Sequence, residues 1–93
     1  MTRCAECIIS DVSRAYRVTP TDMRSTAKRR AIAYARFAAW RLMRHETGLS
    51  LPQIGRLLGH RDHSTVINGI KAADRLLIDN PDFAARYEEA RAL

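Results

Sequence analysis

The stretch from Thr47 to Val66 constrains the fold more than any other part of the chain, because it has the pattern of two helices joined by a tight turn. Ser50 opens the sequence Ser-Leu-Pro-Gln, in which the serine and glutamine side chains can satisfy free amides at a helix N-terminus while proline occupies the tolerant first turn. Gly59 comes directly after Leu58 and suits the backbone angles of a turn. A second apolar period follows, so this stretch predicts a helix-turn-helix unit, a shape that fits the major groove of duplex DNA.

The rest of the chain also has helical periodicity. Apolar residues recur at spacings of three and four, and no run of β-branched residues bounded by turns predicts a strand. The predicted helices span residues 4–16, a single turn that Thr19 caps before Pro20, and then 26 or 27 to 46, 50–58, 62 or 63 to 77 or 78, and 81–92. We therefore expect residues 1–93 to form one all-α domain of five or six helices that contains the helix-turn-helix.

Two glycines near the motif carry separate expectations. Gly48 is placed to end the long helix that precedes the motif. Gly55 is unusual in a helix interior, where glycine costs about 1 kcal/mol relative to alanine. Its presence predicts that a neighbouring helix approaches closely at this point.

Charge is unevenly distributed along the chain. The formal net charge is +6, but residues 1–78 hold fourteen Lys or Arg against six Asp or Glu, whereas residues 79–93 hold two against four. A basic surface favours polyphosphate through counterion release, so nucleic acid is the first partner to consider and an anionic membrane the second. The plain alternative is a soluble protein whose basic face has no partner.

No apolar run approaches the roughly 20 residues that a bilayer-spanning helix needs, and the N-terminus lacks a hydrophobic signal core. We expect a cytoplasmic, nucleoid-associated protein without a membrane partner.

The two cysteines, Cys4 and Cys7, form a lone Cys-x-x-Cys motif. No second pair accompanies them, and His45, His60 and His63 lie far away without the spacing of a zinc finger. We expect no metal and no cofactor, and two reduced thiols one helical turn apart with at least one packed inward. Metal binding or redox work is the alternative.

The helix after the turn opens with polar side chains that its apolar face leaves free to project outward. The candidates for contact with bases are Arg61, Asp62, His63, Ser64, Thr65 and Asn68. Asp62 can accept from a cytosine amino group, His63 can donate or accept, and Arg61 can pair with guanine or phosphate. The plain alternative is that Asp62 only caps the helix and His63 packs beside it.

Basic residues on adjoining elements extend the candidate surface. Lys28, Arg29 and Arg30 stand where a loop leads into the long helix, and Arg44 stands near the end of that helix. A loop–helix junction is where a basic arm can enter the minor groove in helix-turn-helix proteins. The alternative is a solvated charged face on a helical corner without DNA function.

Residues 36–70 resemble the C-terminal DNA-binding domain of the bacterial replication initiator DnaA. The resemblance rests on Thr-Gly-Leu-Ser-Leu-Pro-Gln-Ile-Gly and on Gly-His-Arg-Asp-His-Ser-Thr-Val, which matches the family pattern Gly-Gly-Arg-Asp-His-Thr-Thr-Val in order and spacing. A looser alignment extends over residues 4–78. The implied architecture is that of DnaA domain IV, which is Trp repressor-like in its helix-turn-helix.

The resemblance implies that the chain recognises a short asymmetric duplex, the DnaA box, through the major groove with the second motif helix and through the minor groove with a basic loop. It assigns the groove-facing positions to Arg61, Asp62, His63, Ser64 and Thr65. Arg30 is the best positional match for the minor-groove arginine, next to Lys28 and Arg29. Phosphate contacts at a helix N-terminus fall on Ser50, Leu51 and Pro52.

The chain departs from the family pattern at several positions. Ser64 replaces a threonine and lacks the methyl group that can touch a thymine methyl, so base preference there relaxes or changes. His60 replaces the second glycine of the turn, where a permitted backbone angle is required. His45 and Glu46 stand where the family commonly has Glu-Leu, and the basic loop has its charges nearer the long helix.

Several features of an enzyme are missing from the sequence. It has no Gly-x-x-x-x-Gly-Lys-Ser/Thr phosphate loop, and Asp62, His63 and Ser64 are adjacent, so they splay around a helix start instead of converging as a triad. We expect no ATPase or other enzymatic activity. The predicted function is monomeric, sequence-specific binding of double-stranded DNA at DnaA-box-like sites, which regulates replication initiation or transcription.

Two other functions remain open at the level of sequence. A protein-interaction module would hold a protein partner through its acidic C-terminal helix, with Phe83 and Tyr87 exposed for contact. A Trp-repressor-like regulator would instead be a dimer on palindromic sites.

Overall fold

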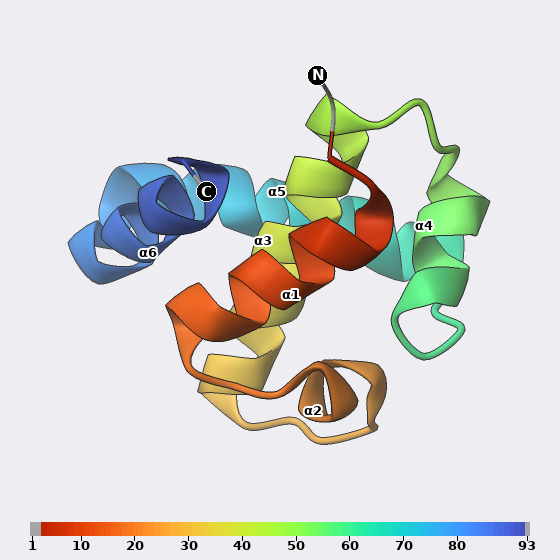
Figure 1. Cartoon of the computed structure of the whole chain (residues 1–93), viewed down its shortest axis with the longest axis horizontal. Coiled ribbons are helices and arrows are strands. Elements are labelled where there is room, and N and C mark those ends of the chain that lie inside the picture. Colours follow the sequence, from red (N-terminus) through yellow and green to blue (C-terminus); the bar gives the residue numbers. More distant parts are fainter. Residues whose placement is uncertain (1–2, 93) are drawn as a thin grey trace.

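The computed structural model describes residues 3–92, and within them it contains α-helices and no strand (Figure 1). The helices in chain order are α1 (Ala5–Tyr16), α2 (Pro20–Arg24), α3 (Arg30–Glu46), α4 (Leu51–Leu57), α5 (His63–Asp79) and α6 (Pro81–Ala92). The predicted all-α fold is confirmed, and α4 and α5 form the predicted helix-turn-helix. None of these helices combines the length and apolar content that crossing a bilayer requires.

Helix α3 is the centre of the domain, with α1 on one side and α5 on the other (Figure 1). Its apolar residues recur at the spacing of one helix face and are fully buried, among them Ile32, Ala35, Leu42 and Met43. Burial of an Ile, Leu or Met side chain contributes roughly 1.5–3 kcal/mol, and most of the stability of these helices comes from this shared interior.

The C-terminal helix is seated on α1 through aromatic contacts. Phe83 and Tyr87 are only 1% and 3% exposed. The ring of Phe83 meets that of Tyr16 edge-on with centroids 5.4 Å apart, and the Tyr16 hydroxyl donates to the Phe83 carbonyl oxygen at 3.0 Å. The expectation that Phe83 and Tyr87 are exposed for a protein partner is therefore wrong, because both rings fill the interior between α6, α1 and α3.

Helix α3 starts at Arg30, not at residue 26 or 27 as the periodicity predicted. The preceding backbone finds partners other than helical ones: the Ala27 amide donates to Ser25 Oγ at 3.1 Å, and the Arg36 guanidinium donates to carbonyl oxygens of this segment. These bonds replace a further helical turn, so residues 26–29 form a loop.

Helix α3 ends at Glu46 as predicted, but its cap differs from the prediction. The C-cap is Thr47 in an extended conformation, and its hydroxyl donates to the Met43 carbonyl oxygen at 2.7 Å while it accepts from the Leu49 amide at 3.2 Å. Gly48 does not have positive φ. The Thr47 side chain therefore caps the end of α3, in place of the glycine that the sequence predicted for this role.

Neither cysteine packs inward. Cys4 is the N-cap of α1, and both Cys4 and Cys7 are exposed. The expectation of a buried thiol is wrong because Ile8, Ile9 and Val12 already occupy the inward face of α1.

Candidate nucleic-acid interface

The first helix of the motif is fixed at its start by the predicted capping box. The Gln53 amide donates to Ser50 Oγ at 3.3 Å, and the Ser50 amide donates to Gln53 Oε1 at 2.8 Å. Ile54 and Leu58 are fully buried and hold the short helix to the core. The helix is therefore positioned by both its cap and its apolar face.

The turn between α4 and α5 uses two residues in the left-handed region. Gly59 has φ of 83°, and His60 has φ of 55°, which is the unusual angle that its place in the turn demanded. The Arg61 amide donates to the Gly55 carbonyl oxygen at 2.9 Å, and a Cβ on Gly55 would overlap the Arg61 carbonyl oxygen. The close approach predicted at Gly55 is real, but the approaching group is chiefly the backbone of the turn.

The start of α5 presents a row of polar side chains to solvent. Asp62 is the N-cap, and its Oδ1 accepts from the Thr65 amide at 2.8 Å. That hydrogen bond is the main reason why the pKa of Asp62 is lowered. Val66 anchors the helix from behind and is fully buried. The exposed residues are Asp62, His63, Ser64, Thr65 and Asn68.

Arg61 has a different environment from the exposed row. Its Nη2 donates to the Ser25 carbonyl oxygen at 2.7 Å, across 36 positions of sequence, and the residue is half-buried. In this structure the guanidinium links the turn to the loop before α3.

Arg36 is a residue whose importance the sequence interpretation missed. It is 6% exposed, its Nε donates to the Met23 carbonyl oxygen at 2.8 Å, and its Nη2 donates to the Ser25 carbonyl oxygen at 2.6 Å. Burial, with the nearby charge of Arg61, lowers the pKa of Arg36. The signal was present, because Arg36 directly follows Ala35 and precedes Ala38 and Ala39 on an otherwise apolar face.

Two guanidinium groups thus meet on one oxygen, the carbonyl of Ser25. Gly59 in the turn also approaches this segment closely, because a Cβ on Gly59 would lie 2.7 Å from the Arg24 carbonyl oxygen. The loop that carries the basic residues and the turn of the helix-turn-helix therefore form a single packed unit. This unit brings the basic loop beside the start of α5.

The remaining candidate residues occupy two places. Lys28, Arg29 and Arg30 are exposed in the packed loop and at the first residue of α3. Arg44 is exposed too, but it lies fourteen residues further along α3, about 21 Å from Arg30 by the helical rise. Near that end of α3 follow the candidates for phosphate contact, the exposed Ser50 and Pro52 and the half-buried Leu51.

The helix-turn-helix geometry agrees with comparisons to known proteins. A family model described as the bacterial dnaA protein helix-turn-helix matches residues 5–72. The chain belongs to this family. The bacterial DnaA helix-turn-helix is a DNA-binding fold, and the match covers α1 to α4, the loop before α3, the turn and most of α5.

Curated relatives carry the name chromosomal replication initiator protein DnaA. The chain is 40% identical over 85 residues to the protein of Neisseria meningitidis serogroup C, which is 91% of this chain and 16% of that protein. It is 40% identical over 77 residues to the protein of Gloeobacter violaceus, and 37% identical over 82 residues to that of Gluconobacter oxydans. These matches cover 83% and 88% of this chain, and 17% of each relative. The chain thus spans about one sixth of the length of its DnaA relatives.

Proposed function

We propose that the chain binds double-stranded DNA as a monomeric single domain at a short asymmetric site related to the DnaA box. In this proposal the start of α5 lies in the major groove, and the loop with Lys28, Arg29 and Arg30 reaches the adjacent minor groove. One observation supports it above the others: the exposed polar start of α5 and the basic loop are packed together through the Ser25 carbonyl.

The side chains of this surface fit base recognition. Asp62 uses Oδ1 for its cap, which leaves Oδ2 to accept from a cytosine amino group. His63, Ser64, Thr65 and Asn68 are exposed and supply hydrogen-bond donors and acceptors along the helix start. A capped helix with a buried anchor holds these groups in a fixed orientation, as base readout requires.

Phosphate contacts complete the proposed interface. The exposed cations Lys28 and Arg29 lie in the loop that is packed against the turn. Exposed Arg44 and the backbone at Ser50–Pro52 lie at and beyond the far end of α3. Contacts to phosphate fix the register of the protein on the duplex and contribute affinity without sequence information.

The proposed role is regulatory and not catalytic. The sequence has no phosphate loop for nucleotide binding, so the chain would occupy DnaA-box-like sites in the bacterial cytoplasm without hydrolysing ATP. Occupation of such sites changes replication initiation or transcription by competing with other proteins for the same DNA.

A binding titration tests the proposal. We expect a duplex that contains a DnaA box to bind on the order of 10³-fold more tightly than a scrambled duplex of equal length at physiological salt. Equal affinity for the two duplexes at every salt concentration would remove the sequence-specific part. Solution mass of the complex should correspond to one protein per site, whereas two proteins per palindromic site would indicate a dimeric regulator.

Selection of bound duplexes from a random pool, repeated with variants, separates base contacts from phosphate contacts. His63→Ala should lose about 1–3 kcal/mol of discrimination at one base position. Lys28→Ala should weaken binding to all sequences alike and reduce the salt slope by roughly one. Arg91→Ala removes one positive charge from an exposed position of α6 and is the control. Preferences unchanged by His63→Ala would contradict its assigned role.

A further inference from the structure

The Cys4–Cys7 pair at the start of α1 plays no part in the proposed DNA interface. The two Sγ atoms lie 3.1 Å apart, and Cys4 Sγ also accepts from the Cys7 amide at 3.4 Å. Both residues are exposed. Because both thiols are exposed, their contact adds nothing to the packing of the core. Its significance is therefore chemical.

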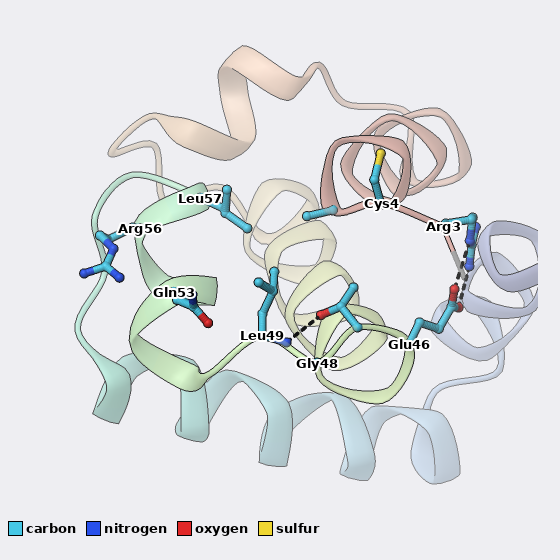
Figure 2. A pocket seen from close by; sticks show the side chains of 10 residues that line it. Arg3, Cys4, Glu46, Gly48, Leu49, Gln53, Arg56 and Leu57 are labelled. Carbon is cyan, nitrogen blue, oxygen red and sulfur yellow. Dashed lines mark hydrogen bonds and ion pairs between the residues drawn. The ribbon is translucent and has the colours of Figure 1, made fainter. Parts of the chain in front are cut away.

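The surroundings of Cys4 allow a small molecule to reach it. Cys4 lines an open cavity of about 710 Å³ between the start of α1, the loop after α3 and helix α4 (Figure 2). The opposite wall carries Gln53 and Leu57, and Arg3 lies beside Cys4, where it pairs with Glu46 at 2.6 Å. The cavity is large enough to admit a peptide-sized thiol compound.

We propose that Cys4 and Cys7 are a redox-active dithiol that exchanges with a low-molecular-weight disulfide such as oxidised glutathione and closes to an intramolecular disulfide. This inference does not depend on the proposed DNA-binding function.

The positions of the residues suit ring closure. Cys4 is the N-cap of α1 and Cys7 lies three residues later, one turn along the helix. Residues at this spacing fall within the Cα separation of about 4.4–6.8 Å that disulfides span. The two sulfurs already face each other, so closure requires a small approach of side chains and no rearrangement of the fold.

The same contacts select Cys4 as the attacking thiol. The hydrogen bond between the two side chains lowers the pKa of Cys4, and backbone amides at the helix start act in the same direction. That hydrogen bond raises the pKa of Cys7. Cys4 is therefore the more readily formed thiolate, and Cys7 is the thiol that resolves the intermediate.

The exchange balances in two steps. The Cys4 thiolate attacks one sulfur of the small disulfide, whose S–S bond breaks and releases one thiolate. Cys7 then loses its proton to solvent and attacks Cys4 Sγ, which expels the second thiolate. The protein dithiol is oxidised by two electrons, the small disulfide is reduced to two thiols, and the two protons lost by the protein are gained by those products.

Equilibration in glutathione buffers tests the proposal. The full chain is incubated over a range of reduced-to-oxidised ratios, quenched with acid, redissolved in neutral denaturing buffer that contains excess iodoacetamide, and weighed intact. We expect a monomer with two alkyl groups in reducing buffer and, in oxidising buffer, a monomer that takes no alkyl group and is lighter than the reduced chain by two hydrogens. Retention of two alkylatable thiols in excess oxidised glutathione would overturn the proposal, as would accumulation of the glutathione adduct alone.

Single substitutions give a second, independent readout. Cys4→Ser replaces the sulfur acceptor at the N-cap with an oxygen, and Cys7→Ser keeps a small polar side chain, so helix content by circular dichroism should stay unchanged. Each variant should form only the mixed disulfide with glutathione. The alkylation rate of Cys4 in the Cys7→Ser variant should reach half its maximum at lower pH than that of Cys7 in the Cys4→Ser variant. The opposite order would contradict the assigned direction of attack.

Discussion

At the scale of single residues, Asp62 divides its two carboxylate oxygens between the fold and the solvent. Oδ1 caps α5 by accepting from the Thr65 amide. Asp62→Asn keeps a capping oxygen but adds an amide donor, whereas Asp62→Ala removes the cap. We expect Asp62→Ala to lower Tm and Asp62→Asn to lower it by less, because asparagine keeps the oxygen cap without the charge, while both alter the preferred base at one position. A changed preference only in Asp62→Ala would mean that the residue acts through helix stability alone.

Acidification gives a related prediction for the same residue. The folded protein holds the pKa of Asp62 below its ordinary value of 3.8, chiefly through the Thr65 hydrogen bond. A depressed pKa in the folded state adds stability above the unfolded pKa, and this stability is lost as pH falls through the folded value. Thermal melts of the native chain and of Asp62→Asn should therefore converge as the pH drops below 3.8. A constant difference across that range would contradict the linkage.

Arg36 illustrates why a single charged residue inside a helix face is difficult to interpret from sequence. Its guanidinium satisfies the carbonyl oxygens of Met23 and Ser25. Arg36→Ala leaves the Met23 carbonyl oxygen without its charged donor and the Ser25 carbonyl oxygen with Arg61 alone, and we expect a loss of about 2–3 kcal/mol in the free energy of unfolding. Urea denaturation measures it. Arg36→Lys keeps the charge but not the fork, so it should recover only part of the loss, and full recovery would show that charge alone matters.

At the scale of helices, α3 and α5 pack closely where Gly69 faces Trp40. A Cβ on Gly69 would overlap the indole ring of Trp40 and would touch Phe37. Gly-to-Ala substitution inside a helix normally stabilises by about 1 kcal/mol. Here the overlap reverses the sign, and we expect Gly69→Ala to destabilise by about 1–3 kcal/mol.

Gly48 is the matched control for that substitution. A Cβ there has no neighbour within 4 Å, and the residue lacks positive φ. Gly48→Ala should change the free energy of unfolding by no more than about 0.5 kcal/mol. If both alanine variants unfold at the same urea concentration, the contact between Gly69 and Trp40 does not limit the packing of α3 on α5.

The sequence predicted the type and order of the helices better than their ends. Apolar spacing identifies α5 because Val66 and Ala73 must face the core, and a Ser-Leu-Pro-Gln box marks the start of α4 at Ser50. The predicted start of α3 was wrong because residues 26–29 contain no local sequence signal against a helix. The backbone just before them is held by Arg36 of α3, which reaches back to the carbonyl oxygens of Met23 and Ser25.

At the scale of the whole molecule, the basic loop and the turn of the helix-turn-helix depend on each other. Arg61→Lys keeps the charge but loses the planar fork that reaches the Ser25 carbonyl. We expect faster amide hydrogen exchange in residues 25–29 and weaker binding to every duplex. Arg56→Lys makes the same change on an exposed residue of α4 and is the control. Unchanged exchange in Arg61→Lys would show that Arg36 alone holds the loop.

Only part of the candidate surface could be predicted from the sequence. The polar row at the start of α5 was identifiable because the apolar period of the helix leaves those positions outside. That Arg61 contacts Ser25 was not identifiable, since the two residues are 36 positions apart and no local pattern pairs them. The buried position of Tyr87 was missed for the same reason, because its hydroxyl bonds to Arg41 on α3, 46 positions earlier in the chain.

The length of α5 has a consequence for how the molecule approaches its target. His63 and Asp79 are separated by sixteen helical rises, about 24 Å, and the acidic α6 lies beyond, on the other side of α1 and α3 from α4 (Figure 1). At physiological ionic strength the screening length is about 8 Å, so the acidic residues of α6 are screened from a duplex bound at the His63 end of α5. In dilute buffer that length reaches about 30 Å. The chain then behaves as an electric dipole that turns its positive pole toward a polyanion before the two touch.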